Sequence, residues 1–177
     1  TVTDIDDNLY YIFLSNDGIN WYAPQNQPTS GEIFSGDTNN ETWIFGGSAG
    51  FVYVTIDFVT WNGFNIVGAD SSVNAILWTG KFWVAGYYNS VPPSPNAISY
   101  DGYNWESSGP SFTIACYCLA TDGKVVVGGG EGDVSVMYTV DGITWNNVNP
   151  PDIFDGQPCR DICWDGKQFI AVGTLSP

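Results

Sequence analysis

The chain has 177 residues, of which 19 are acidic and 4 basic, so its formal net charge is −15. This length fits one domain, and the scarcity of basic residues excludes duplex nucleic acid as a partner, because binding to phosphates needs a basic surface. The sequence contains no histidine, which excludes Ser-His-Asp and Cys-His catalysis and histidine-ligated metals. No apolar run approaches the roughly 18 residues of a membrane-spanning helix, so no membrane insertion is expected.

A seven-residue turn motif recurs along the chain at intervals of about 40 to 44 residues. It reads Ser/Thr-x-Asp-Gly-x-Asn/Thr-Trp, with Phe58 in place of the glycine in the second copy. The four copies occupy residues 15–21, 55–61, 99–105 and 139–145. A second turn, Asp-Gly-Lys in its clearest form (122–124 and 165–167), recurs out of phase with the first and precedes a short apolar segment. Two interleaved motifs at one period indicate a repeat protein.

Each repeat predicts four short strands. In residues 71–110 the expected strands are 72–78, 81–87, 96–100 and 103–107, with tight turns at Thr79-Gly80 and Asp101-Gly102. Asp-Gly between β-branched and aromatic residues is a strong hairpin signal, and no long segment has the 3.6-residue apolar period of a helix. Four strands in about 40 to 45 residues are typical of a β-propeller blade. The sequence therefore predicts an all-β propeller.

The turn motif resembles the Asp box, or BNR repeat, of sialidase-like β-propellers. The resemblance implies a structural role for the aspartates and tryptophans of the motif, which are Asp17, Trp21, Asp57, Trp61, Asp101, Trp105, Asp141 and Trp145. This role fits their chemistry, since an Asp carboxylate can accept backbone N–H bonds within its own turn. The motif here is one residue shorter than the family's form. Sialidase activity is not implied, because that family grips its substrate with three arginines and Arg160 is the only arginine of the chain.

The chain begins and ends in the middle of a repeat. Residues 8–23 correspond to strands three and four of a blade, and residues 159–173 to strands one and two. We therefore expect one domain (1–177) of four four-stranded antiparallel blades, at about 24–68, 69–109, 110–149 and 150–177 plus 1–23. In this arrangement the two chain ends together close the last blade, which removes exposed strand edges. The alternative is a fragment or half-ring, two copies of which make eight blades.

Four cysteines lie in pairs in two of the expected first strands, at positions 116, 118, 159 and 163. Three interpretations remain open. They can be buried thiols, since free cysteine is among the most buried residue types. Cys116 and Cys159 align when the Asp-Gly-Lys turns are superposed, so an inter-blade disulfide between them is an alternative if their Cα atoms approach to about 4.4–6.8 Å. The third interpretation is a metal site of all four, which their spacing disfavours.

The loops that follow the second strands are candidates for ligand contact. Tyr87, Tyr88 and Asn89 form an aromatic–amide patch of the kind that stacks on sugar rings, and the alternative is that these rings pack inside the fold. The acidic segment 4–8, together with Glu131 and Asp133, offers oxygen ligands for Ca²⁺. The alternative there is a solvated acidic terminus. No other cofactor or metal is expected.

The composition, with little Lys and Glu and much Asn, Gly, Thr and aromatic residue, resembles that of secreted or cell-surface β-proteins. We expect a non-enzymatic extracellular or surface module that binds glycan or protein through its loop face and that can self-associate. The second hypothesis is a structural repeat module of an appendage, capsid or filament. The third is a glycoside hydrolase with a pair of catalytic carboxylates.

Overall fold

The computed structural model of the chain describes residues 12–66, 71–88, 96–109, 112–151 and 153–174. These residues form fourteen β-strands and one short 3-10 turn, η1 (Ser48–Gly50), and contain no α-helix. Strand pairs throughout the described chain are antiparallel. None of the described residues belongs to a helix long and apolar enough to cross a bilayer.

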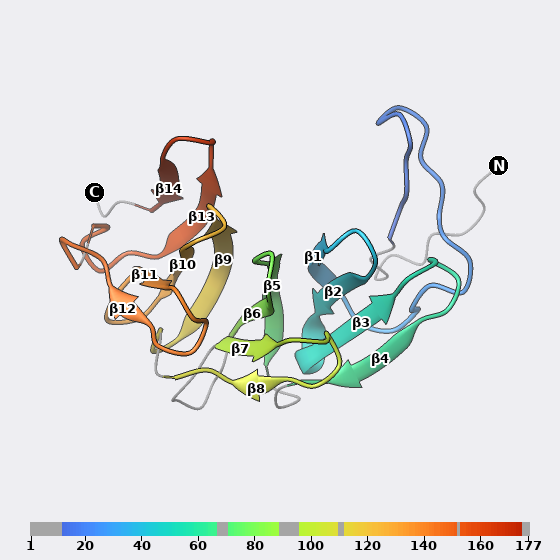
Figure 1. Ribbon diagram of the computed structural model, residues 1–177, viewed down its shortest axis with the longest axis horizontal. Helices are drawn as coiled ribbons and strands as arrows, with labels where there is room; N and C mark the ends of the chain where they lie inside the picture. Colours follow the sequence, from blue (N-terminus) through green and yellow to red (C-terminus); the bar gives the residue numbers. More distant parts are fainter. Residues whose placement is uncertain (1–11, 67–70, 89–95, 110–111, 152, 175–177) are drawn as a thin grey trace.

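The strands fall into three four-stranded units and one two-stranded half-unit (Figure 1). Unit 1 contains β1 (Ile33–Thr38), β2 (Trp43–Gly47), β3 (Phe51–Thr55) and β4 (Asn62–Asn65). Unit 2 contains β5 (Ser72–Trp78), β6 (Trp83–Tyr88), β7 (Asn96–Ser99) and β8 (Glu106–Ser107). Unit 3 contains β9 (Ala115–Thr121), β10 (Val126–Glu131), β11 (Val136–Thr139) and β12 (Asn146–Asn147). Half-unit 4 contains β13 (Cys159–Trp164) and β14 (Phe169–Gly173).

The predicted all-β, antiparallel fold is confirmed, and each unit is a meander in which strands pair in chain order. A single pair between Tyr88 and Ala115 joins units 2 and 3 into one extended sheet. The first strand of each unit carries the same irregularity, with one residue skipped near its start, at Phe34, Asn74, Tyr117 and Arg160. This shared bulge shows that the units repeat one backbone pattern.

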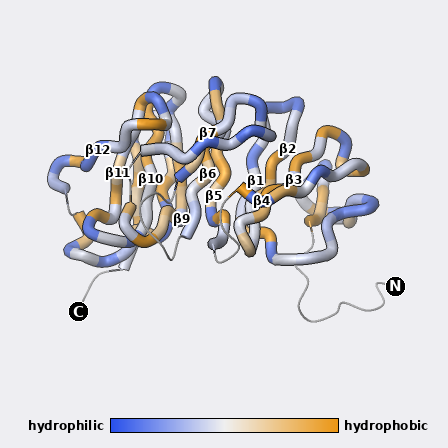
Figure 2. Tube along the Cα trace, turned by 90° about the horizontal axis from the view of Figure 1, so that it is seen from below, coloured by the Kyte–Doolittle hydropathy of each residue, from blue (hydrophilic) through white to orange (hydrophobic). Residues whose placement is uncertain are grey.

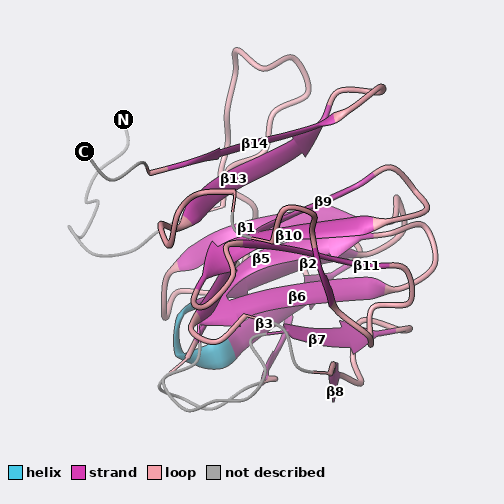
Figure 3. Cartoon of the chain, turned by 90° about the vertical axis from the view of Figure 1, so that its left-hand side faces the viewer, coloured by secondary structure: helices cyan, strands magenta, loops and turns pink. Residues whose placement is uncertain are grey.

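The units follow one another along an arc. Their first strands, β1, β5, β9 and β13, contact each other in that order. Residues 12–23, which we call the N-terminal hairpin, lie at one end of the arc and half-unit 4 at the other (Figure 1). The strand pair β13–β14 lies at one side of the stacked strands (Figure 3). Among the described residues, β13 and β14 make a two-stranded sheet that the N-terminal hairpin does not join. The expected closure of a fourth blade by the two chain ends is therefore not confirmed.

The core is divided among the junctions between units. One cluster fills the space between units 1 and 2, where Ile44, Val52 and Val54 meet Val73 and Trp83. A second lies between units 2 and 3, and a third between unit 3 and half-unit 4. Hydrophobic stretches accordingly lie mainly in the strands that pack at these junctions (Figure 2), whereas the fourth strands β8 and β12 contain only polar residues. Burial of apolar surface between successive units is what holds the arc together.

Close approach between units depends on glycine. A Cβ atom on Gly46 would lie 2.5 Å from Val73 Cγ1, and one on Gly86 would lie 2.6 Å from Cys116 Sγ. The third junction repeats this contact, with Gly129 of β10 against Cys159 of β13. All three glycines sit three residues after the start of the second strand of their unit. At the same position in β14 the chain has Val172, which is 54% exposed.

Candidate functional site

In each copy of the seven-residue turn motif, which we call the Asp-box motif because of its resemblance, the aspartate carboxylate is hydrogen-bonded within its own turn. In the third copy, Asp101 Oδ1 accepts hydrogen bonds from the backbone N–H groups of Tyr103 and Asn104, at 2.8 and 2.7 Å. Its Oδ2 accepts from the Asn104 side-chain amide at 2.7 Å. The Ser99 hydroxyl donates to Asp101 Oδ1 and accepts from the Gly102 N–H at 2.8 Å. The carboxylate is thus tied to the backbone on both sides of the turn.

The same network recurs at Asp17, Asp57 and Asp141, each of which accepts two backbone N–H bonds of 2.7 to 2.8 Å. Hydrogen bonds from the backbone N–H three residues later, and from the N–H before it, hold the pKa of each carboxyl below its ordinary value. The same cause lowers the pKa of Asp101. A carboxylate held ionised in this way is a poor proton donor, so these residues suit a structural role.

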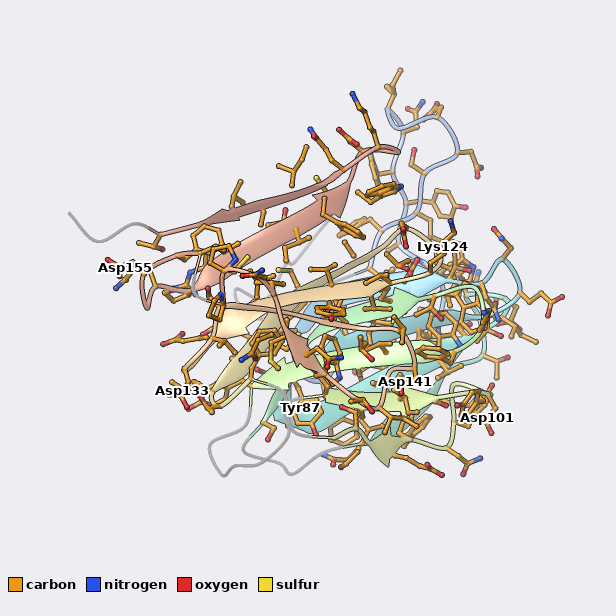
Figure 4. All side chains as sticks on the ribbon, turned by 60° about the vertical axis from the view of Figure 1, so that its left-hand side comes forward. Tyr87, Asp101, Lys124, Asp133, Asp141 and Asp155 are labelled. Atoms are coloured by element: carbon orange, nitrogen blue, oxygen red, sulfur yellow. The ribbon has the colours of Figure 1, made fainter. Side chains whose placement is uncertain are left out.

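Two classes of turn gather at one end of the strands. Asp101, Asp141 and Lys124 lie at that end, and Asp133 and Asp155 lie at the opposite end (Figure 4). The Asp-Gly-Lys turns are fastened like the Asp boxes, because Asp122 Oδ1 accepts the N–H groups of Lys124 and Val125, each at 2.8 Å. This end of the molecule therefore carries a set of acidic turns that are hydrogen-bonded internally.

The exposure of each Asp-box tryptophan depends on whether a preceding unit packs against its ring. Trp145 of unit 3 is 7% exposed and packs with Phe112 in the cluster between units 2 and 3. Trp105 of unit 2 packs against the cluster between units 1 and 2. Trp61 of unit 1 is half-buried and donates its indole N–H to the Gln25 carbonyl, in the segment before β1. Trp21 of the N-terminal hairpin, which follows no described unit, is 61% exposed.

The structure describes two residues of the aromatic–amide patch predicted to bind ligand, Tyr87 and Tyr88. Tyr87 is 3% exposed and belongs to the core between units 1 and 2. Burial raises the pKa of its hydroxyl, which is hydrogen-bonded to Ser107. The ring of Tyr87 thus packs inside the fold, which is the alternative considered for it, and a contact between Tyr87 and a ligand stays a prediction. Tyr88 is 38% exposed, and Asn89 lies outside the described residues.

The cysteines are free thiols, so the disulfide between Cys116 and Cys159 is absent from the structure. These two residues occupy equivalent positions in successive units. Their side chains therefore point the same way, Cys116 onto Gly86 and Cys159 onto Gly129, rather than toward each other. The thiol that does reach Cys159 is Cys118, whose Sγ also lies 2.6 Å from the Cβ position of Gly129.

The thiol of Cys118 donates a hydrogen bond to the Gly129 carbonyl at 3.6 Å. Its interaction with the neighbouring Cys159 sulfur, together with burial, raises the pKa of Cys118. Burial also raises the pKa of Cys116. The hydrogen-bonding interaction with Cys118 lowers the pKa of Cys159. Cys116, Cys118 and Cys159 are buried, and Cys163 is exposed. This arrangement matches the interpretation of these three as buried core thiols.

No calcium or other metal site is formed by the described residues, which contain no group of three potential ligands. The acidic segment 4–8 lies outside the described residues. Glu131 accepts a hydrogen bond from the Tyr117 hydroxyl, and the Arg160 guanidinium lies over the Tyr117 ring at 5.0 Å. The one arginine is therefore engaged with a tyrosine.

Two surface hollows lie beside the strands. One, of about 140 Å³, is lined by Ser99, Asp101 and Glu106 among others. Another, of about 160 Å³, lies between Glu32 and Tyr53. Pockets that enclose small molecules have volumes of roughly 300 Å³ or more, so neither hollow has the size of an ordinary substrate site.

The edge of β14 is open. At one end of β14 the Gln168 carbonyl accepts a hydrogen bond from the Asp165 N–H, and at the other end the Thr174 N–H donates one to the Pro158 carbonyl. The even-numbered residues from 168 to 174 therefore direct their backbone groups toward β13. Because these directions alternate along a strand, the backbone groups of Phe169 and Ala171 point to the other side, where no described strand pairs with them. Ile170 and Val172 are 41% and 54% exposed, although Ile44 and Val84, which correspond to Ile170 in units 1 and 2, are fully buried.

No family model and no curated protein matches the chain. The solved structures that are similar in fold include two with the titles "COPII on membranes, outer coat vertex" and "The structure of the COPII coat assembled on membranes". Each has a TM-score of 0.54 and 12% sequence identity over 81% of this chain. The chain spans 44% and 24% of the lengths of the two matched chains. At this identity the likeness is one of fold.

Proposed function

We propose that the chain is a non-enzymatic β-propeller module of the Asp-box kind that binds protein, outside the cell or at its surface, through the strand edges that it leaves open. The units at about 24–68, 69–109 and 110–149 are its complete blades, and the fourth blade is divided between the chain ends (150–177 and 1–23). The observation that carries the proposal is the open edge of β14, along which Phe169 and Ala171 present backbone donors and acceptors.

A strand edge of this kind favours a protein partner, because an extended segment of another chain can pair with it by main-chain hydrogen bonds. The exposed side chains of Ile170 and Val172 add apolar surface beside these bonds. A glycan partner has less support, since Tyr87 is buried and Tyr88 is the one described ring of the predicted patch that is exposed. Catalysis by paired carboxylates has less support as well, since the Asp-box carboxylates are already bonded within their turns.

The second hypothesis, a structural module of an assembly, gains some support from the comparisons. The two structures of similar fold belong, by their titles, to a coat assembled on membranes. An assembly role and a protein-binding role use the same open edge. Both roles predict that blocking the β14 edge abolishes binding, whereas the glycan and hydrolase hypotheses do not.

The test is to block the edge without altering the rest of β14. Ala171→Pro removes the outward N–H and is compatible with an edge strand, and Ala171→Ser keeps the N–H as a matched control. Immobilised wild-type chain and both variants, checked for fold by circular dichroism, are exposed to the extracellular protein fraction of the source organism. We expect proteins retained by the wild type and by Ala171→Ser to be lost on Ala171→Pro. Equal retention by all three would contradict the proposal, and Tyr88-dependent binding on a glycan array would favour the glycan hypothesis.

A further inference from the structure

The three complete units share one register across their second, third and fourth strands. The residue just before the Asp-box Ser or Thr pairs with one residue of the second strand and one of the fourth. These triples are Ile44–Val54–Asn62, Val84–Ile98–Glu106 and Val127–Tyr138–Asn146. The strand pairs within the N-terminal hairpin and within half-unit 4 therefore show which of their residues are equivalent to the members of these triples.

The N-terminal hairpin contains the second half of this pattern. Leu14 precedes the Asp-box Ser15, and it pairs with Tyr22 through two backbone hydrogen bonds of 2.8 and 2.9 Å. This pair corresponds to Val54–Asn62 in unit 1. The N-terminal hairpin is thus a third and a fourth strand for which the described chain supplies no first and second strand.

Half-unit 4 contains the first half of the four-strand pattern, namely strands β13 and β14. The pair Trp164–Phe169 at its turn corresponds to Trp78–Trp83 in unit 2. Ile170 therefore occupies the position that Val84 holds in unit 2. Half-unit 4 is a first and a second strand for which the described chain supplies no third and fourth strand.

We infer that the open edge of β14 is completed by the N-terminal hairpin of a second copy of this chain, in a register that places Leu14 opposite Ile170 and Ser15 opposite Phe169. This inference rests on the proposed function and names the partner of the proposed edge. The backbone N–H and carbonyl of Leu14 are hydrogen-bonded to Tyr22, and the backbone N–H and carbonyl of Ile170 point toward β13. Leu14 and Ile170 then form a non-hydrogen-bonded pair, whose Cα atoms are about 4.5 Å apart in antiparallel sheets.

The arrangement of the arc favours a second copy over the same chain. The N-terminal hairpin and half-unit 4 lie at opposite ends of the arc (Figure 1), separated by junctions that are packed with buried side chains. The contacts at Gly46, Gly86 and Gly129 leave these junctions no room to close further. A second copy offers its own N-terminal hairpin to this edge head to tail, and such contacts close a ring where the rotation between copies allows it.

Exposed apolar side chains at both ends fit the same partner. Trp21 is 61% exposed, whereas its counterpart Trp145 is 7% exposed because unit 2 lies against it. When the N-terminal hairpin joins half-unit 4 of a second copy, unit 3 of that copy lies next to Trp21. It then covers the Trp21 ring in the way that unit 2 covers Trp145. Ile170 and Val172 then face unit 1 of the chain that supplied the hairpin.

The experiment links the two positions between separately prepared chains. One chain carries Leu14→Cys and the other Ile170→Cys, both with Cys163→Ser because Cys163 is exposed and pairs directly with Ile170. The chains are mixed and incubated with oxidised glutathione, whose disulfide accepts two electrons as the two thiols lose their protons, so that one cystine and two reduced glutathione molecules form. Disulfides form at Cα separations of about 4.4–6.8 Å. We expect a linked dimer that contains one chain of each kind.

Two controls separate register from chance collision. Ile19→Cys, at a turn position that is 81% exposed, replaces Leu14→Cys in a parallel mixture, and at least tenfold less linked dimer is expected. A single chain that carries both Leu14→Cys and Ile170→Cys is oxidised at low concentration. A disulfide within that chain at monomer mass, or equal linking by Ile19→Cys, overturns the inference. If linking fails while Ala171→Pro still abolishes binding of another protein, the proposed function stands and only the identity of the partner is wrong.

Discussion

Cys159 lies directly against Gly129, and the same contact between a first strand and the second strand of the preceding unit joins Cys116 to Gly86 and Val73 to Gly46. The side chain occupies the space where the glycine has no Cβ. Interiors are packed too densely to yield such space without strain. The spacing between units is therefore set at these glycines.

Replacing Gly86 or Gly129 by alanine should destabilise the chain. The new Cβ would lie 2.6 Å from Cys116 Sγ in the first case and from two sulfur atoms in the second. Overpacking of this kind costs about 1–3 kcal/mol, and urea unfolding followed by circular dichroism measures it. Val172→Ala at the equivalent position of β14 is the matched control, and at low protein concentration it should change the free energy of unfolding by much less, since Val172 is 54% exposed. Equal losses at the three positions would contradict the packing argument.

The Asp-box turns predict a loss of stability in acid. Backbone and side-chain hydrogen bonds lower the pKa of Asp101 in the folded chain, so its contribution is fully present above the unfolded value of about 4 and is lost as the pH falls through the lowered folded value. We expect the urea midpoint to drop steeply below about pH 4. Asp101→Ala should lower the midpoint at neutral pH and flatten this dependence. Asp133→Ala removes the same charge from an exposed loop and should leave the dependence unchanged.

Local structure could be predicted from the sequence because it is encoded in short turns. The strand expected at 72–78 is β5 without any shift, and those expected at 81–87 and 96–100 differ from β6 and β7 by one or two residues at their ends. The fourth strand, expected at 103–107, is reduced to Glu106 and Ser107. The reason is that the Asp101 turn holds the backbone as far as Asn104, which leaves few residues for pairing.

Contacts between units could not be predicted in the same way. Alternation in β6 shows that Tyr87 and Tyr88 face opposite sides, but which side meets a neighbouring unit depends on long-range packing. The alignment of Cys116 with Cys159 correctly identified equivalent positions. It did not show that equivalent side chains point in the same direction along the arc, so that the thiol that meets Cys159 at Gly129 is Cys118. Where the two chain ends lie likewise depends on the curvature of the whole arc.

The thiols should differ sharply in reactivity. Cys163 is exposed, whereas Cys116, Cys118 and Cys159 are buried. The neighbouring Cys159 sulfur and burial raise the pKa of Cys118, and burial raises the pKa of Cys116. Because the thiolate is the reactive form, a colorimetric disulfide reagent should modify one thiol quickly in the native chain. After unfolding in urea it should modify all four. Fewer than four would mean that a disulfide forms in the isolated protein.

Trp21 and Trp145 should respond differently to truncation. Trp145→Ala removes a buried ring from the core between units 2 and 3 and should cost about 3–5 kcal/mol of unfolding free energy. Trp21→Ala should cost little at low protein concentration, since its ring is largely exposed. At high concentration Trp21→Ala should weaken self-association, which sedimentation velocity detects. A large loss of stability at low concentration would mean that Trp21 is already covered within its own chain.

Self-association should strengthen with salt. Two copies that each carry a formal charge of −15 repel one another, and this repulsion is screened as the Debye length falls from about 30 Å at low ionic strength to about 8 Å at physiological strength. The strand pairing and apolar contacts at the β14 edge are short-ranged and keep their strength. Sedimentation velocity across a salt series should therefore show the dimer fraction of the wild type rising with ionic strength. Ala171→Pro should remain monomeric at every salt concentration, because it lacks the outward N–H, and Ala171→Ser should follow the wild type. A dimer that dissociates as salt is added would instead indicate pairing through opposite charges, with the four basic residues of the chain as the first positions to change.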